Sequence, residues 1–165
     1  MQPEFLLEVI RRCRDRRIHT AVDTSGFGDP SAVLRVAALT DLVLFDLKII
    51  DDRRHQAFTG VSNYLILDNL RTLAEWHRSV IVRFPLVPGI NDDAENVSAL
   101  GALVASLGLS RVDVLPYHRA GTAKYQRLNR QYLLDGTQPP SRQEQERVAQ
   151  ALAGCGLSVT LGGSS

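Results

Sequence analysis

Apolar residues recur along this chain in two alternating rhythms, one with the period of a helix and one with the period of a strand. The first helical pattern runs from Pro3 to about Arg16, and Pro3 suits a first helical turn. A second is opened by Asp29-Pro30, as cap and first turn, and runs through Leu39. Further helices are predicted from about Asp68 to His77, from Asn91–Asn96 to a stop at Gly108, and after a Ser141/Glu144 capping-box pattern to about Cys155.

Short apolar runs with the alternation of strands separate these helices. The runs are Ile18–Gly26, Asp41–Lys48, Val80–Gly89, Arg111–His118 and Leu157–Gly163. Ile49–Asn63 is interpreted as a connection with turn residues at Gly60 and Asn63, and Arg119–Pro140 as a polar surface loop. Strands and helices that alternate in this way predict a parallel α/β sheet, either open or forming part of a (β/α) barrel.

Composition narrows the class of protein. The 165 residues suit a single domain, 1–165, and 44% hydrophobic with 22% charged residues is typical of a globular protein. A net charge of +1 gives no indication of a nucleic-acid partner. No apolar run approaches the ~20 residues of a membrane span, so no membrane association is expected.

The cysteines bear on both location and chemistry. We expect the two of them, Cys13 and Cys155, to be reduced structural thiols in a cytoplasmic protein, and we expect no signal peptide in the first residues. Two widely separated cysteines are too few to hold an iron–sulfur cluster or a structural zinc.

Polar side chains gather where the predicted strands end. They are Asp23 and Thr24 in the first strand, Asp46 and Lys48 in the second, Arg83 in the third and His118 in the fourth. The carboxyl ends of parallel strands meet at one edge of a sheet, which is where α/β proteins place their sites. This convergence favours a functional interpretation.

The alternation along the second strand predicts where its charges point. Asp46 and Lys48 share a face with Leu42 and Leu44, whereas Val43, Phe45 and Leu47 share the other. If the polar face lines a barrel interior, Asp46 and Lys48 project into its mouth, close enough to pair.

Each of these residues also has a purely structural interpretation. Asp46 and Lys48 could form a simple ion pair at a strand end, and Asp23 could cap the turn at Thr24–Gly26. Arg83 could only neutralise a neighbouring acid, and His118 could have a packing role.

Several segments together resemble one family. "IHTAVDTSG", "DLVLFDLK", "HQAFTGVSN", "VIVRFPLVPGIND" and "VDVLPYHRAGTAKYQRL" occur in this order. They are similar to segments of glycyl-radical-enzyme activating enzymes, the pyruvate formate-lyase activase group of the radical S-adenosylmethionine superfamily. The resemblance runs from about Gln2 to Gly162 and implies the C-terminal part of a radical S-adenosylmethionine partial barrel, with mostly parallel strands.

The resemblance also implies an activity. In this family a 4Fe–4S cluster, reduced by a protein such as flavodoxin, splits S-adenosylmethionine, and the resulting radical removes a hydrogen from a glycine of a partner glycyl radical enzyme. The partner could be pyruvate formate-lyase, a diol dehydratase or a decarboxylase. The loop residues Tyr125, Arg127 and Tyr132 could touch it or belong to an inert excursion.

Site residues follow by the same resemblance. Asp46, Leu47 and Lys48 match the segment that holds S-adenosylmethionine, and His118 matches a histidine against its adenosine end. Arg83 matches an arginine that faces the cavity. Asp23 and Thr24, together with Asp46, match a monovalent-cation site. A zwitterionic sulfonium ligand suits carboxylates and a base at fixed positions.

The chain departs from the family at two motifs. It contains neither the three cysteines spaced CxxxCxxC that bind the cluster nor the "GGEP" that meets the methionyl group. We therefore expect the C-terminal part of a longer activase, with Met1 an internal methionine, that makes no radical alone. The strand at Thr20–Thr24 would then expose an edge that invites dimerisation or aggregation.

Three other functions remain open on the sequence. One is a degenerate module that binds S-adenosylmethionine or a partner without catalysis, and another is a structural domain with no ligand. The third is a barrel lyase with Lys48 as a Schiff-base nucleophile, which Asp46 beside it disfavours because a carboxylate favours the ammonium form.

Overall fold

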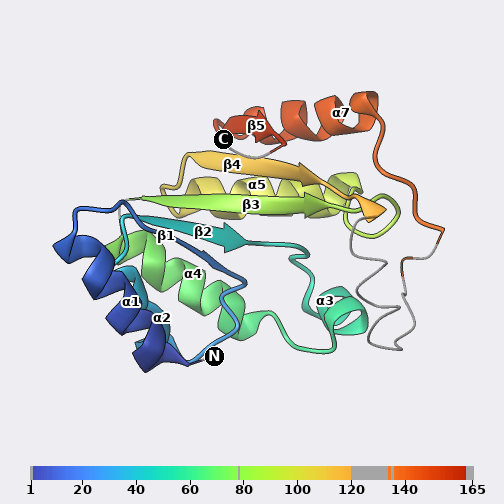
Figure 1. Cartoon of the computed structure of the whole chain (residues 1–165). Coiled ribbons are helices and arrows are strands. Elements are labelled where there is room, and N and C mark those ends of the chain that lie inside the picture. The colour runs from blue at the N-terminus through green and yellow to red at the C-terminus, as the bar shows by residue number, and fades with distance from the viewer. Residues whose placement is uncertain (1, 78, 120–133, 135, 163–165) are drawn as a thin grey trace.

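The computed structural model describes residues 2–77, 79–119, 134 and 136–162. It contains one sheet whose strands are β1 (Ala21–Thr24), β2 (Leu42–Asp46), β3 (Val80–Leu86), β4 (Arg111–Pro116) and β5 (Ser158–Leu161). All neighbours pair in parallel, and their order in space is β1-β2-β3-β4-β5 (Figure 1). The predicted parallel α/β sheet is thereby confirmed.

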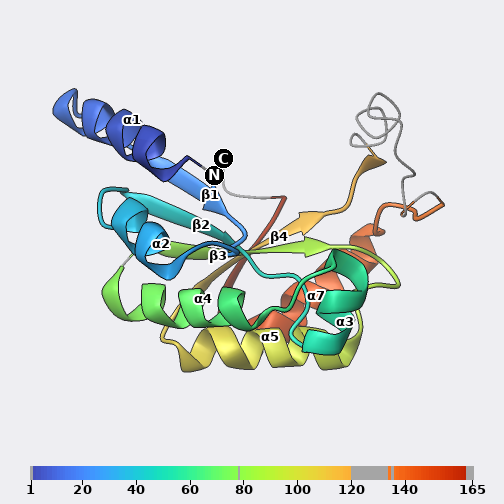
Figure 2. The same ribbon diagram turned by 90° about the horizontal axis from the view of Figure 1, so that it is seen from below.

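One helix precedes these strands and others connect them, and most of the helices lie on one face of the sheet. They are α1 (Pro3–Asp15), α2 (Pro30–Ala37), α3 (Asp52–Thr59), α4 (Tyr64–Trp76), α5 (Ala94–Ser106) and α7 (Arg142–Ala153). Figure 2 shows α4, α5 and α7 as a layer beneath the sheet, with α1 beyond the β1 edge. A sequential strand order with helices on one face is the arrangement of a (β/α) barrel segment, because a doubly wound sheet reverses its order and carries helices on both faces. Among the described residues the sheet stays open.

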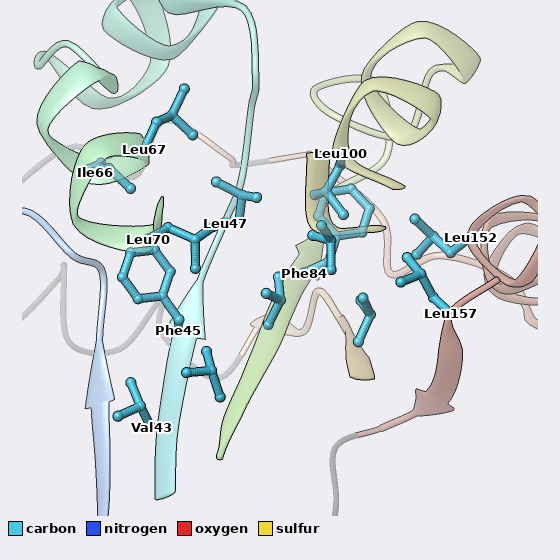
Figure 3. Close-up of a cluster of buried hydrophobic side chains, with 14 of the residues drawn as sticks. Val43, Phe45, Leu47, Ile66, Leu67, Leu70, Phe84, Leu100, Leu152 and Leu157 are labelled. Atoms are coloured by element: carbon cyan, nitrogen blue, oxygen red, sulfur yellow. The ribbon is translucent and has the colours of Figure 1, made fainter. Parts of the chain in front are cut away.

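The core lies between the sheet and this helix layer. Val43, Phe45 and Leu47 of β2 and its extension point towards α4, where Leu70 is fully buried, and Phe84 of β3 points towards α5 (Figure 3). The predicted alternation along β2 is confirmed, since Leu42, Leu44, Asp46 and Lys48 are half-buried on the opposite side. We call that second side, which none of the described helices covers, the open face.

Two predicted helix starts, at Asp29 and Ser141, are also confirmed. The Asp29 side chain accepts from the Ala32 amide at 2.9 Å, and Ser141 and Glu144 bond reciprocally as a capping box. Both arrangements satisfy amides that the first turn of a helix otherwise leaves without a partner.

Three local predictions need correction. Asp52–Thr59, which the sequence suggested was part of a connection, is the helix α3. It was missed because its sequence has little apolar periodicity. Asp51 caps its start, and Gly60 in the left-handed conformation ends it. The next helix begins at Tyr64 rather than near Asp68. Cys155 lies in the turn after α7 and not within the helix. Most of the predicted loop Arg119–Pro140 lies outside the described residues.

Two further observations concern the exterior. β1 is at an edge of the sheet, as the sequence suggested, and of the described strands it pairs with β2 alone. No helix in the described ranges combines the length and the apolar character needed to cross a membrane.

The turn after β1 gives the first prediction. Gly26 has φ +71°, and an added Cβ would clash with the ring of the buried Phe45. Gly60 has φ +80°, but an added Cβ would meet nothing within 4 Å. We expect Gly60→Ala to lower the free energy of unfolding by about 1 kcal/mol, because alanine is disfavoured at this positive φ. Gly26→Ala should cost about 1–3 kcal/mol more because the Phe45 ring must move. Urea unfolding of both variants measures the difference, and equal costs would contradict it.

Candidate functional site

The strand register brings polar and charged residues from separate segments into neighbouring positions, from Asp46 at the carboxyl end of β2 to Arg83 in the middle of β3. Asp46 of β2 is in register with Arg83 of β3, Arg83 with Asp113 of β4, and Asp113 with Thr160 of β5. These four positions form a row across the open face. Asp23 of β1 is in register with Leu44, on the same face and one step nearer the amino ends.

Three of these side chains, together with that of Lys48, form a charge network. Arg83 Nε and Nη2 donate to Asp46 Oδ1 at 2.9 and 2.8 Å, and Nη2 also donates to Asp23 Oδ1. Lys48 Nζ donates to Asp46 Oδ2 at 3.2 Å. Both oxygens of Asp46 are therefore held by cations, and Arg83 joins two acids that lie 23 positions apart in the sequence. We call Asp23, Asp46, Lys48 and Arg83 the charge network.

Burial divides the network into an inner and an outer part. The side chains of Arg83 and Asp46 are 17% and 19% exposed, whereas those of Lys48 and Asp23 are 35% and 61% exposed. Burial tends to lower the pKa of Arg83, but its hydrogen bonds to Asp23 and Asp46 outweigh that effect and raise the pKa. The guanidinium stays charged, and the two outer charges remain accessible to a ligand.

The structural alternatives considered for these residues are therefore largely realised. Asp46 and Lys48 do form an ion pair, and Arg83 does neutralise neighbouring acids. Asp23 does not cap the turn after β1: the Gly26 amide donates to Thr24 Oγ1 at 3.0 Å instead. These bonds assemble a polar site at the strand ends, and an ion pair of this kind is as compatible with ligand binding as with a structural role.

The remaining predicted residues are placed differently. The Leu47 side chain is 1% exposed and belongs to the core, so only its backbone could meet a ligand. His118 is exposed, two residues beyond the end of β4 and at the same edge of the sheet as the network. Thr24 pairs in register with Phe45, and its side chain accordingly faces the helix layer rather than Asp23.

The structure bears on the two metal groups that the family resemblance implies. The carboxylates of Asp23 and Asp46 share the guanidinium of Arg83, and the described residues contain no group of three or more acidic, histidine or cysteine side chains suited to a metal ion. The cation site at Asp23, Thr24 and Asp46 stays a prediction. A 4Fe–4S cluster does not fit, because it needs at least three thiolates and Cys13 and Cys155, on α1 and after α7, are the chain's two cysteines.

Sequence analysis missed a set of buried asparagines around this site. Asn63, Asn69, Asn91 and Asn96 are 1–3% exposed, and each side-chain amide donates to backbone carbonyls of distant segments. Asparagine beside glycine, proline and aspartate normally indicates a turn, and nothing local signals a side chain that reaches across 40 or more positions, as Asn91 and Asn96 do to Lys48.

Similarity to known proteins agrees with this architecture. The chain is 36% identical over 163 residues to pyruvate formate-lyase 1-activating enzyme of Escherichia coli K12, covering 96% of this chain and 66% of that protein. It is 35% identical to the trans-4-hydroxy-L-proline dehydratase activating enzyme of Clostridioides difficile, covering 97% of this chain and 54% of that protein. The crystal structure of a domain of pyruvate-formate lyase-activating enzyme from Bacteroides vulgatus matches with a TM-score of 0.81 at 36% identity, over 98% of this chain and 91% of the other.

These similarities extend across the whole fold, and the chain belongs to the glycyl-radical-enzyme activating enzymes of the radical S-adenosylmethionine superfamily. It spans about half the length of the first curated relatives it matches, with 54% and 43% of their sequences covered. No family model matches the chain.

Removing the central cation of the network should be costly. Arg83→Met leaves Asp46 in a half-buried position with Lys48 as its remaining cation, and we expect a loss of about 1–3 kcal/mol in the free energy of unfolding. The matched control is Arg35→Met: Arg35 pairs with Glu4 at the surface, with side chains 51% and 73% exposed, and should lose less than about 1 kcal/mol. Equal losses in urea unfolding would show that the network contributes no more than a surface pair.

A nearby aspartate makes stability depend on pH. Asp93 accepts from Arg54 at 2.6 Å and from the Asn96 amide at 3.0 Å, and these bonds lower its pKa from 3.8 to about 2. A lowered pKa stabilises the folded state above the unfolded-state value, and the contribution is lost as pH falls from about 4 to 2. The stability difference between the unaltered chain and Asp93→Asn should shrink over that range and stay constant between about pH 5 and 7. A difference independent of pH down to 2 would contradict it.

Proposed function

We propose that this chain is the part of a glycyl-radical-enzyme activating enzyme that binds S-adenosylmethionine on the open face of its sheet. The observation that supports this most is the charge network, which places alternating carboxylates and cations at the carboxyl edge of a barrel-like parallel sheet, in a chain that belongs to this family. That edge is where such sheets bind ligands.

The chemistry of the network suits the ligand. S-adenosylmethionine carries a sulfonium, an ammonium and a carboxylate, so its site must offer both signs of charge at fixed positions. Lys48 has three N–H donors, of which the bond to Asp46 uses one, and its half-exposed ammonium can meet the ligand carboxylate. Asp46 and Asp23 provide negative charge for the cationic groups, and Arg83 holds these two carboxylates in place.

The other predicted residues have subsidiary roles in this proposal. His118, at the end of β4, would lie against the adenosine end of the ligand. Leu47 would contribute its backbone, and Asp23, Asp46 and Thr24 a monovalent-cation site, the Thr24 contribution coming from its carbonyl because its side chain faces the helix layer.

Radical formation requires a 4Fe–4S cluster, which the two cysteines of this chain are too few to bind. In the complete activase, a 4Fe–4S cluster held by cysteines that this chain lacks, with a protein such as flavodoxin as reductant, would supply the electron for cleavage of S-adenosylmethionine. We propose that the present chain binds and orients the ligand without cleaving it. The hydrogen would be taken from a glycine of a partner such as pyruvate formate-lyase or trans-4-hydroxy-L-proline dehydratase, the partners that the relatives' names identify. The two cysteines are free thiols, which fits a cytoplasmic location.

A binding module without catalysis is the second candidate, and the cysteine count is the observation that favours it. A lyase with Lys48 as nucleophile is less well supported, since Lys48 would have to give up its ion pair with Asp46. The two leading candidates share ligand binding and differ in whether a chain extended by a cluster-binding segment produces a radical.

Ligand binding by this chain is the decisive measurement. S-adenosylmethionine titrated into the 165-residue chain should shift the NMR signals of Asp46, Lys48 and Arg83. Asp46→Asn and Lys48→Ala should each raise the apparent Kd by about tenfold or more, equivalent to about 1.4 kcal/mol, because each removes one charge from the site. Glu8→Gln on the exposed surface of α1 serves as control and should leave Kd unchanged. Shifts confined to other regions, or equal affinities in all variants, would contradict the proposal.

A further inference from the structure

The pairing of β2 with β3 ends beside the charge network because the next residue that would donate a ladder hydrogen bond is a proline. The last register pair is Asp46 with Arg83, and the Leu47 amide still donates to the Arg83 carbonyl at 2.9 Å. In a parallel ladder the next donor would be the backbone nitrogen of Pro85, which carries no hydrogen. The segment from Lys48 onward therefore leaves the sheet at the residue that the proposed function assigns to the ligand.

An asparagine side chain occupies the place of the missing ladder bonds. Asn91 Nδ2 donates to the carbonyls of Lys48 at 3.1 Å and Pro85 at 2.7 Å, and so bridges the diverging ends of β2 and β3. Its Oδ1 accepts from the Val87 amide at 2.8 Å. Asn91 itself is 2% exposed, and the bonds that it makes are partly buried.

Two more buried asparagines hold the same segment from the helix side. Asn96 Nδ2 donates to the Lys48 carbonyl at 3.2 Å, and its Oδ1 accepts from the Ile50 amide at 2.9 Å. Asn63 Nδ2 donates to the carbonyls of Ile49 at 3.1 Å and Ile50 at 2.7 Å. We call Asn63, Asn91 and Asn96 the asparagine clamp; it lies at the start of α4, after β3 and in the first turn of α5.

We infer that Asn91 and Asn96 are positioning residues for Lys48, and that through Lys48 they set the affinity for S-adenosylmethionine. On one side Lys48 is fixed by the ladder that ends at Asp46, and on the other by the bonds of the clamp to its own carbonyl and to Ile50. Its side chain then leaves a fixed backbone towards Asp46 on the open face. Without the clamp, residues 48–50 would lose these side-chain bonds and Lys48 could shift. In catalysis a displacement of about 1 Å can lower the rate up to ~100-fold, and we expect the affinity for a charged ligand to be sensitive in the same way. The inference about affinity rests on the proposed function; the inference about the position of Lys48 does not.

The chain offers a matched control at another strand end. Asn69 is 2% exposed, and its Nδ2 likewise donates to two carbonyls, those of Gly26 at 2.7 Å and Gly28 at 3.0 Å, in the loop after β1. Asn69→Ala should destabilise the fold as Asn91→Ala and Asn96→Ala do, because each removes a buried side chain that bonds to backbone groups. It does not touch Lys48, so it separates a general loss of stability from a displaced lysine.

The experiment compares the three alanine variants by NMR, first without ligand and then with S-adenosylmethionine. We expect the Lys48 and Asp46 side-chain signals to move in Asn91→Ala and Asn96→Ala and to stay in place in Asn69→Ala. The apparent Kd should rise about tenfold in the first two and less than about twofold in the control. If an alanine variant does not fold, Asn91→Asp replaces it, since it keeps the size and the acceptor for Val87 but puts oxygen opposite two carbonyls.

The outcomes separate the two proposals. Unmoved Lys48 signals in the folded clamp variants overturn the positioning role, whatever the ligand does. Moved signals with unchanged affinity, or an equal loss of affinity in Asn69→Ala, overturn the link to the ligand. An unaltered chain that shows no binding overturns the proposed function and with it the effect on affinity, while the ligand-free signals still decide how Lys48 is positioned.

Discussion

The parallel pairing of β2 with β3, with Asp46 opposite Arg83, is the constraint on which the open face depends. It places a guanidinium beside a half-buried carboxylate, which neither strand could accommodate alone, because an unpaired charge at that depth is strongly unfavourable. Arg83 then reaches Asp23 on β1, and Asp46 holds Lys48. A polar site thus forms on one side of a sheet whose other side is a closed apolar core.

The same pairing explains why the site lies where the sheet stops. The ladder between β2 and β3 ends at Pro85, just past Arg83. Beyond that point the two strands diverge, and buried asparagine side chains donate to their backbone carbonyls. Backbone groups there are satisfied without a neighbouring strand, which leaves Lys48 in an ordered segment that is not part of the sheet. Asn91 and Asn96 bond on both their donor and acceptor sides, and buried amides of this kind specify one conformation for the segment that carries Lys48.

The sequential strand order determines which face of the sheet the helices cover and which face is left for the polar residues. The described helices between the strands lie on one face of the sheet. The polar residues near the strand ends point to the opposite, open face. The family to which the chain belongs uses such a sheet as part of a longer protein, and the chain covers 54% and 66% of two of those relatives. Chemistry that needs cluster-binding cysteines accordingly lies beyond this chain's own residues, whereas the charge network, the site proposed for the ligand, is built from them alone.

The sequence by itself determined the class of fold, the helix starts that carry clear caps and the direction of the β2 side chains. Period-2 and period-3.6 patterns and caps such as Asp29 and Ser141 are local signals, and local geometry translates them directly. It did not predict α3, whose residues carry little apolar periodicity, and it missed Asn63, Asn91 and Asn96, which resemble ordinary turn residues. It also could not decide whether Arg83 meets Asp46, Asp23 or both. Only the tertiary structure decided the long-range contacts of these asparagines and of Arg83, because their bonds to Lys48, Ile50, Asp46 and Asp23 join residues that lie 13 to 60 positions apart, and register and packing alone bring such residues together.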